Sequence, residues 1–162
     1  MSSFDLTLDH LNFIMDLRGV AMNIQEKSIV IVADGTKENF LRIFRENHSL
    51  FDISVLELKE FKKKYYFDYT EEAVYRVHKK YGVIKDIAEI YLENIYYINE
   101  DIKTDKTDFL KDIKDYLDAN DLLIYDPLFK RFLNGKTVVL YKLGNLDKFY
   151  ERTFENLKKI AD

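Results

Sequence analysis

The stretch that decides the fold is Ser28-Ile29-Val30-Ile31-Val32-Ala33-Asp34-Gly35-Thr36, which leads directly into the segment 37–47. Its first part is apolar at consecutive positions, a pattern typical of a parallel strand that is covered on both faces. A turn around Gly35 follows, and then apolar residues recur at helical spacing, with Asp34 or Thr36 as the expected N-cap. The sequence therefore predicts a strand–turn–helix unit of the kind that builds parallel α/β sheets.

The composition indicates a folded, helix-rich protein. The chain has 162 residues, of which 47% are hydrophobic and 33% charged, and these proportions are ordinary for a single globular domain. It holds one proline and five glycines, and so few helix-breaking residues favour long helices over a sandwich dense in turns. The twelve phenylalanines and twelve tyrosines predict a core rich in rings.

The same composition excludes several classes of protein. The absence of cysteine removes disulfides, thiolate zinc sites and cysteine nucleophiles. Acidic residues near the N-terminus argue against a signal peptide, and no apolar run approaches the roughly 18 residues of a membrane span. We therefore expect a cytoplasmic protein with no membrane partner. A net charge of −4 gives no overall reason to expect nucleic-acid binding, which would need a local basic face.

Hydrophobic periodicity places the remaining elements. We expect strands over 28–33, 51–56 and 137–141. Helices are expected over 5–22, 37–47, 58–66, 70–81, 84–98 and 127–133, from Thr107 onward, and from Asn145 to the end of the chain.

These elements predict a single α/β domain over 1–162. It is helix-rich, with a small, mainly parallel three-stranded sheet. Its parts are an N-terminal helix in 1–24, a strand–helix–strand followed by helices over 28–98, and a helix, short helix, strand and terminal helix over 107–162.

The turn after the first strand lacks the residues of a phosphate-binding loop. A P-loop needs the pattern G-x-x-x-x-G-K-[ST], whose glycines let backbone N–H groups approach the phosphates. Here Ala33-Asp34-Gly35-Thr36-Lys37 offers one glycine, and the Asp34 carboxylate would repel a phosphate. His10, His48 and His78 lie on separate predicted elements, without metal-ligand spacing. We assign no catalytic residue, no metal ligand and no cofactor, and no motif indicates an enzyme.

Basic residues in two neighbouring segments form the candidate nucleic-acid site. The lysines of the first segment lie beside Tyr65, Tyr66 and Phe67. Lysines that contact phosphates, next to rings that stack on bases, suit single-stranded DNA or RNA. Lysines on a surface helix beside core rings also occur in proteins that bind no nucleic acid, so both interpretations stay open. The candidate residues are Lys59, Lys62, Lys63, Lys64, Arg76, Lys79 and Lys80.

Several segments stand in an order known from one protein family. They are Ile29 to Val32, the helix with Phe40-Leu41, the strand Ile53-Ser54-Val55-Leu56, the helix that begins Leu58-Lys59-Glu60-Phe61, the segment Asn120 to Phe129, the strand Val138-Val139-Leu140-Tyr141, and the helix Leu146 to Leu157. This order resembles the N-terminal helicase-like region of AddB-type, UvrD-related helicase–nucleases, in which a helical insertion follows the short helix. The strand that ends at Tyr141 stands where that family runs its Walker B-like strand.

The resemblance implies a degenerate P-loop NTPase-like core that has lost its ATPase residues. No Walker A sequence precedes the helix over 37–47, and Tyr141-Lys142-Leu143-Gly144 lacks the Asp-Glu pair that would hold magnesium. Such a domain would be a non-catalytic, structural or DNA-contacting part of a DNA repair or recombination helicase–nuclease. The implied partners are single-stranded DNA and a nuclease or helicase subunit, or a C-terminal region outside this chain. Parallel pairing of strands 28–33 and 137–141 would fit this core, and antiparallel pairing would reject it.

Two other functions remain open. One is a protein-interaction module, oligomeric or with an unknown partner, that uses a helical face rich in Tyr and Ile. Its candidate surfaces are Tyr96-Tyr97 and the helix over 5–22. The other is a small enzyme of unrecognised type, which would need a deep pocket with converging polar groups.

Overall fold

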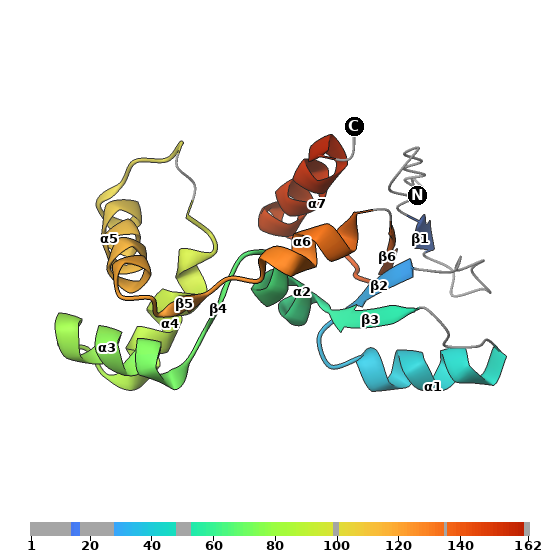
Figure 1. Ribbon diagram of the computed structural model, residues 1–162, viewed down its shortest axis with the longest axis horizontal. Helices are drawn as coiled ribbons and strands as arrows, with labels where there is room; N and C mark the ends of the chain where they lie inside the picture. Colours follow the sequence, from blue (N-terminus) through green and yellow to red (C-terminus); the bar gives the residue numbers. More distant parts are fainter. Residues whose placement is uncertain (1–13, 17–27, 48–52, 99–100, 135, 161–162) are drawn as a thin grey trace. The chain divides into compact units, whose positions relative to one another are not determined.

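The computed structural model describes residues 14–16, 28–47, 53–98, 101–134 and 136–160, and the chain forms two compact units (Figure 1). The first, here called the sheet unit, comprises the described residues up to Tyr65 and from Pro127 onward. The second, the inserted unit, runs from Tyr66 to Asp126. Along the chain, the inserted unit interrupts the sheet unit between α2 and α6.

A four-stranded parallel sheet organises the sheet unit. Its order is β1-β6-β2-β3, and β2 pairs in parallel with both of its neighbours. The helix-rich α/β fold predicted from the sequence is confirmed, and the three predicted strands are β2, β3 and β6. The strands are β1 (Ile14–Asp16), β2 (Ser28–Val32), β3 (Ser54–Glu57) and β6 (Thr137–Tyr141).

Strand β2 forms the centre of the core. All five of its residues are buried, as the consecutive apolar run predicts for a strand covered on both faces. On one face of the sheet, Val30 and Val32 pack against Phe40 and Phe44 of α1 (Lys37–Asn47). Because side chains alternate along a strand, the neighbouring isoleucines point to the opposite face.

A cluster of rings joins the helices on the other side of the sheet. Figure 1 shows α6 and α7 on the side away from α1. The ring centroid of Phe61 in α2 lies 5.5 Å from that of Tyr65, 5.9 Å from that of Phe129 in α6 and 5.4 Å from that of Phe154 in α7. Ring pairs at these distances stabilise a core beyond the apolar area that they bury. The helices are α2 (Leu58–Tyr65), α6 (Pro127–Leu133) and α7 (Lys148–Ile160).

The inserted unit is a small helical bundle closed by a two-stranded antiparallel sheet. α3 packs on α4, and α4 packs on α5. β4 pairs with β5, so the two ends of the unit lie next to each other. A segment whose ends meet in this way can be inserted into another unit without separating the flanking chain. The elements are β4 (Asp68–Tyr69), α3 (Glu71–Tyr81), α4 (Lys85–Ile95), α5 (Asp105–Ala119) and β5 (Leu123–Ile124).

The helix expected over 5–22 is wrong at residues 14–16, which form β1 at the edge of the sheet. The rest of that predicted helix lies outside the described residues. At 14–16, backbone pairing with β6 outweighs the helical spacing of the apolar residues, since tertiary context overrides local preference. No pattern predicts β4 and β5, because two residues are too few to show a periodicity.

The other helices lie close to their predicted limits. α5 begins earlier than expected, because Thr104 rather than Thr107 is its N-cap, and the two threonines form a reciprocal capping box. α7 begins at Lys148 rather than near Asn145, and the Asp147 carboxylate accepts a hydrogen bond from the N–H of Tyr150 at 3.0 Å. None of the helices in the described part of the chain is both long enough and apolar enough to cross a bilayer.

Truncation of Phe61 to alanine should destabilise the sheet unit by about 3–5 kcal/mol, the usual cost of removing a buried phenylalanine ring. Phe61 is fully buried and its ring touches rings from three helices. Urea unfolding followed by circular dichroism measures the change as a lower midpoint. Phe132→Ala removes a partly exposed ring from the same unit and is the matched control. Equal losses in the two variants would contradict the organising role of Phe61.

Candidate functional site

The turn between β2 and α1 lies at the carboxyl-terminal edge of the parallel sheet, where α/β proteins bind their ligands. The turn is closed by the N–H of Thr36, which donates to the Ala33 carbonyl at 3.1 Å, and by the Thr36 hydroxyl, which donates to the same carbonyl at 2.6 Å. Gly35 has a φ of 78°, a left-handed conformation that glycine adopts without strain. β3 ends beside β2, so the turn from β3 into α2 adjoins this one.

Two carboxylates cap each other's helices across these adjoining turns. Asp34, which precedes α1, accepts a hydrogen bond from the N–H of Lys59 in the first turn of α2, at 2.8 Å. Glu57, which precedes α2, accepts from the N–H of Gly35 at 2.9 Å and from the N–H of Lys37 at 3.4 Å, at the start of α1. We call Asp34 and Glu57 the crossed caps. Of the two N-caps expected for α1, Thr36 stands directly before the helix, and its carbonyl accepts from the N–H of Phe40 at 3.0 Å. The Asp34 carboxylate instead caps α2, because the parallel strands bring the two helix starts together.

Lys37 and Glu60 extend this network. Glu60 Oε2 accepts from the N–H of Glu57 at 2.9 Å, and the Nζ of Lys37 lies 3.0 Å from the same oxygen. Partial burial acts to raise the pKa of Glu60, but the Glu57 N–H and the Lys37 ammonium together outweigh it, and the pKa of Glu60 is lowered from its ordinary value. The network thus contains three carboxylates, those of Asp34, Glu57 and Glu60, and one ammonium, that of Lys37, so its net charge is negative.

This arrangement fills the N-terminus of α1 with an anion of the protein itself. In phosphate-binding loops, the first N–H groups of the helix point at phosphate oxygens. Here the N–H groups of Gly35 and Lys37 point at the Glu57 carboxylate, and the Lys37 ammonium is engaged with Glu60. A phosphate would have to displace Glu57 and approach an excess of negative charge. The geometry therefore favours a structural role for the turn.

The structure separates the four candidate lysines of α2. Lys59 and Lys64 are exposed and Lys63 is half-buried, whereas Lys62 is only 4% exposed. The reason is helical spacing, because Lys62 shares the buried side of α2 with Phe61. A lysine with so little exposed surface is a poor phosphate contact, so we retain Lys59, Lys63 and Lys64 as the α2 candidates.

The remaining sequence candidates lie on α3 in the inserted unit, where each has a partner of its own. The Nε of Arg76 lies 2.7 Å from Oε1 of Glu72, one turn earlier. The Nζ atoms of Lys79 and Lys80 lie over tyrosine rings, at 5.5 Å and 3.9 Å from the centroids. Because the α2 and α3 candidates belong to different units, each group is a separate candidate surface.

Lys130 on α6 is a cation that no sequence pattern connects with the lysines of α2. Its Nζ lies 5.1 Å from the ring centroid of Tyr65, the last residue of α2. The whole inserted unit stands between these two residues in the sequence. Only the fold therefore brings Lys130 to the end of α2.

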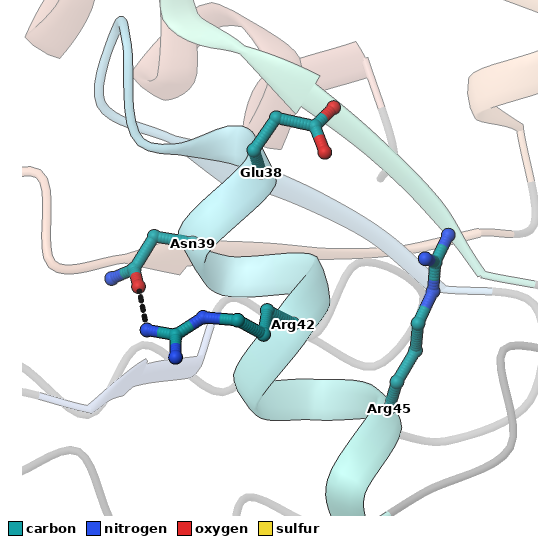
Figure 2. Close-up of a pocket in the computed structure, with 4 residues that line it drawn as sticks. All are labelled: Glu38, Asn39, Arg42 and Arg45. Atoms are coloured by element: carbon teal, nitrogen blue, oxygen red, sulfur yellow. Dashed lines mark hydrogen bonds between the residues drawn. The ribbon is translucent and has the colours of Figure 1, made fainter.

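A surface pocket on α1 is lined by Glu38, Asn39, Arg42 and Arg45. Figure 2 shows that the two guanidinium groups extend to different sides of the helix rather than toward each other. An Nη2 atom of Arg42 donates to Oδ1 of Asn39 at 2.8 Å. Anion sites need donors that converge on one point, and these arginines do not converge.

The histidines give no metal site in the described part of the chain. His78 is half-buried and its Nδ1 is hydrogen-bonded to the carbonyl of Val83, so it is a satisfied boundary residue. His10 and His48 lie outside the described residues. Within the described ranges, no group of three His, Asp or Glu side chains is placed to hold a metal ion.

Comparison of the chain with protein-family models, curated proteins and solved structures gave no match. The function is therefore inferred from the geometry of the two units and from the segments that carry the resemblance.

Replacement of Glu60 by glutamine should reduce the loss of stability of the fold as the pH falls from neutral to acid. Because its folded-state pKa is lowered, ionised Glu60 stabilises the fold above its unfolded pKa, and this contribution is lost as the pH falls through the folded pKa. Thermal melts of wild type and Glu60→Gln, from neutral pH to about pH 3, should therefore differ most at neutral pH and converge in acid. Glu155→Gln, on the exposed side of α7, should retain the wild-type profile. A constant difference between Glu60→Gln and wild type at every pH would contradict the assigned role.

Proposed function

We propose that this chain is a non-catalytic, helicase-like domain that serves as a structural and nucleic-acid-contacting part of a DNA repair or recombination machine. The observation that carries the non-catalytic part is the position of Glu57. Its carboxylate accepts hydrogen bonds from Gly35 and Lys37 at the start of α1, where an ATPase of this architecture binds phosphates. Lys37, the one lysine of the turn, forms its ion pair with Glu60.

The strand arrangement supports the helicase-like part of the proposal. β2 and β6 are parallel neighbours, with Val30 opposite Val139, which is the pairing expected of a helicase-like core. The bundle of α3, α4 and α5 follows the short helix α2 as an insertion, in agreement with the order of segments in AddB-type proteins. A random α/β protein would not need to share both features.

The exposed cations of the sheet unit support the nucleic-acid part. Lys59 and Lys64 are exposed on α2, and Lys64 extends its Nζ to 5.9 Å from the ring centroid of Phe129. Lysines held beside rings suit single strands, because the ammonium groups contact phosphates while rings stack on unpaired bases. The implied partner is single-stranded DNA, with a nuclease or helicase subunit as the further component.

Two titrations test this proposal. A fluorescent ATP analogue with Mg²⁺ should show no saturable binding, because the Glu57 carboxylate already holds the amides of the turn. A labelled single-stranded oligonucleotide should bind at low salt, with an affinity that falls steeply as salt rises. The double reversal Lys63→Glu/Lys64→Glu should weaken this binding, whereas Lys62 is left unchanged because it is buried. Saturable ATP binding would refute the non-catalytic part, and absence of oligonucleotide binding at low salt would refute the contact.

The inserted unit favours a second candidate function, a protein-interaction module. Ile90 on α4 is 52% exposed, and Tyr97, which follows the end of α4 at Ile95, is 46% exposed. Tyr96 of the predicted pair is buried and donates a hydrogen bond to the Phe67 carbonyl at 2.7 Å, so it does not contribute to a surface. The other predicted surface, over 5–22, is a strand at 14–16 and otherwise lies outside the described residues.

If α4 mediates self-association, Ile90→Lys should convert an oligomer into a monomer, because a charge on this face would be costly to bury. Light scattering of the full chain over a range of protein concentrations measures the mass. Ile102→Lys, at an exposed position between α4 and α5, is the control and should keep the wild-type mass. A wild-type chain that stays monomeric at every concentration would exclude self-association through α4.

A further inference from the structure

The junction of α2 and α6 in the sheet unit gathers cations around rings from both helices. The Nζ of Lys64 in α2 lies 5.9 Å from the ring centroid of Phe129 in α6. In the opposite direction, the Nζ of Lys130 in α6 lies 5.1 Å from the ring centroid of Tyr65 in α2. Each helix therefore places a lysine over a ring of the other helix, and this fixes both ammonium groups at one junction.

The rings continue from this junction to the surface. The ring of Phe129 is stacked on that of Phe132, with centroids 6.2 Å apart. Phe132 is 41% exposed, and the Nζ of Lys136 lies 4.9 Å from its centroid. A buried ring thus packs against an exposed ring that has a cation over its face. Single-stranded nucleic acid is bound by combinations of this kind, in which a supported ring stacks on a base and neighbouring lysines contact phosphates.

The distribution of charge separates this surface from the one on α3. The inserted unit holds eight lysines and arginines against fifteen acidic residues, whereas the rest of the chain holds seventeen against fourteen. Within the sheet unit, the segment from Pro127 onward holds eight basic residues against four acidic ones. Phosphates are attracted by the summed field of a unit as well as by single contacts. The field of the sheet unit thus favours a polyanion, and that of the inserted unit opposes one.

We propose that single-stranded nucleic acid binds to the α2–α6 junction of the sheet unit, with Lys64, Lys130 and Lys136 as phosphate contacts and Phe132 as the ring on which a base stacks. This inference rests on the proposed function, because it names the surface and the strand type of the same nucleic-acid contact. It assigns three residues, Lys130, Phe132 and Lys136, that the sequence pattern does not select. It also excludes Arg76, Lys79 and Lys80 on α3 as phosphate contacts.

Fluorescence anisotropy of a labelled oligothymidylate, titrated with the full chain at several salt concentrations, tests this assignment. The double reversal Lys130→Glu/Lys136→Glu should weaken binding about tenfold or more and should reduce the salt slope by about 1.4, at roughly 0.7 for each phosphate contact. Phe132→Ala should weaken binding roughly fivefold or more without changing the salt slope, since stacking releases no counterions. The matched control is Lys79→Glu/Lys80→Glu on α3, which should stay within about twofold of wild type.

The outcomes distinguish this inference from the proposed function. Wild-type binding that is lost in the α3 control but retained in the Lys130/Lys136 variant overturns the α2–α6 assignment and leaves the nucleic-acid contact standing. A wild-type chain that binds no oligonucleotide at low salt overturns both. Circular dichroism establishes that each variant is folded, and the neutral pair Lys130→Gln/Lys136→Gln provides the same test if charge reversal prevents folding. A duplex of the same length should bind more weakly, because paired bases are not available to Phe132.

Discussion

The crossed caps Asp34 and Glu57 are the interaction on which the edge of the sheet depends. The start of a helix carries unpaired N–H groups and a partial positive charge, which is satisfied best by a carboxylate. Each helix here takes that carboxylate from the turn before the other helix. These hydrogen bonds connect the start of α1 with the start of α2 at the ends of β2 and β3. The ion pair of Lys37 with Glu60 adds a second connection between the same two helices. The two βα turns therefore hold each other in place.

The same interaction supplies the turn between β2 and α1 with an anion from the protein itself. The amides that a phosphate would use are held by Glu57, and the lysine of the turn is held by Glu60. Bound phosphate orders such turns in nucleotide-binding proteins; here a side chain supplies the anion. The sheet unit carries the basic excess of the chain and the inserted unit the acidic excess, which fits the scaffold function that we propose.

Local pattern predicted the parts of the fold that depend on nearby residues. The apolar run of β2 and the hydrophobic periodicity of the helices predicted most elements, because the buried face of a strand or helix shows as apolar residues a few positions apart. What it missed depends on distant residues. β1 forms by backbone pairing with β6, which is distant in the sequence. The hydrogen bonds of the crossed caps likewise join residues more than twenty positions apart. The prediction of the candidate site failed for the same reason. Lys62 is buried on α2 together with Phe61, and Lys130 lies near Tyr65 although the whole inserted unit separates the two residues in the sequence.

The Glu57 carboxylate lies at the start of α1, where a phosphate-binding loop holds its phosphate. Nuclear magnetic resonance of the ¹⁵N-labelled chain tests this placement through the backbone amide signals of Gly35 and Lys37, the two donors to Glu57. Both signals should move strongly in Glu57→Ala, since each amide loses a charged acceptor, and both should stay fixed when Mg²⁺ and ATP are added to the wild type. Signals that are unchanged in Glu57→Ala but that move on addition of ATP would show that these amides are available to a phosphate and are not held by Glu57.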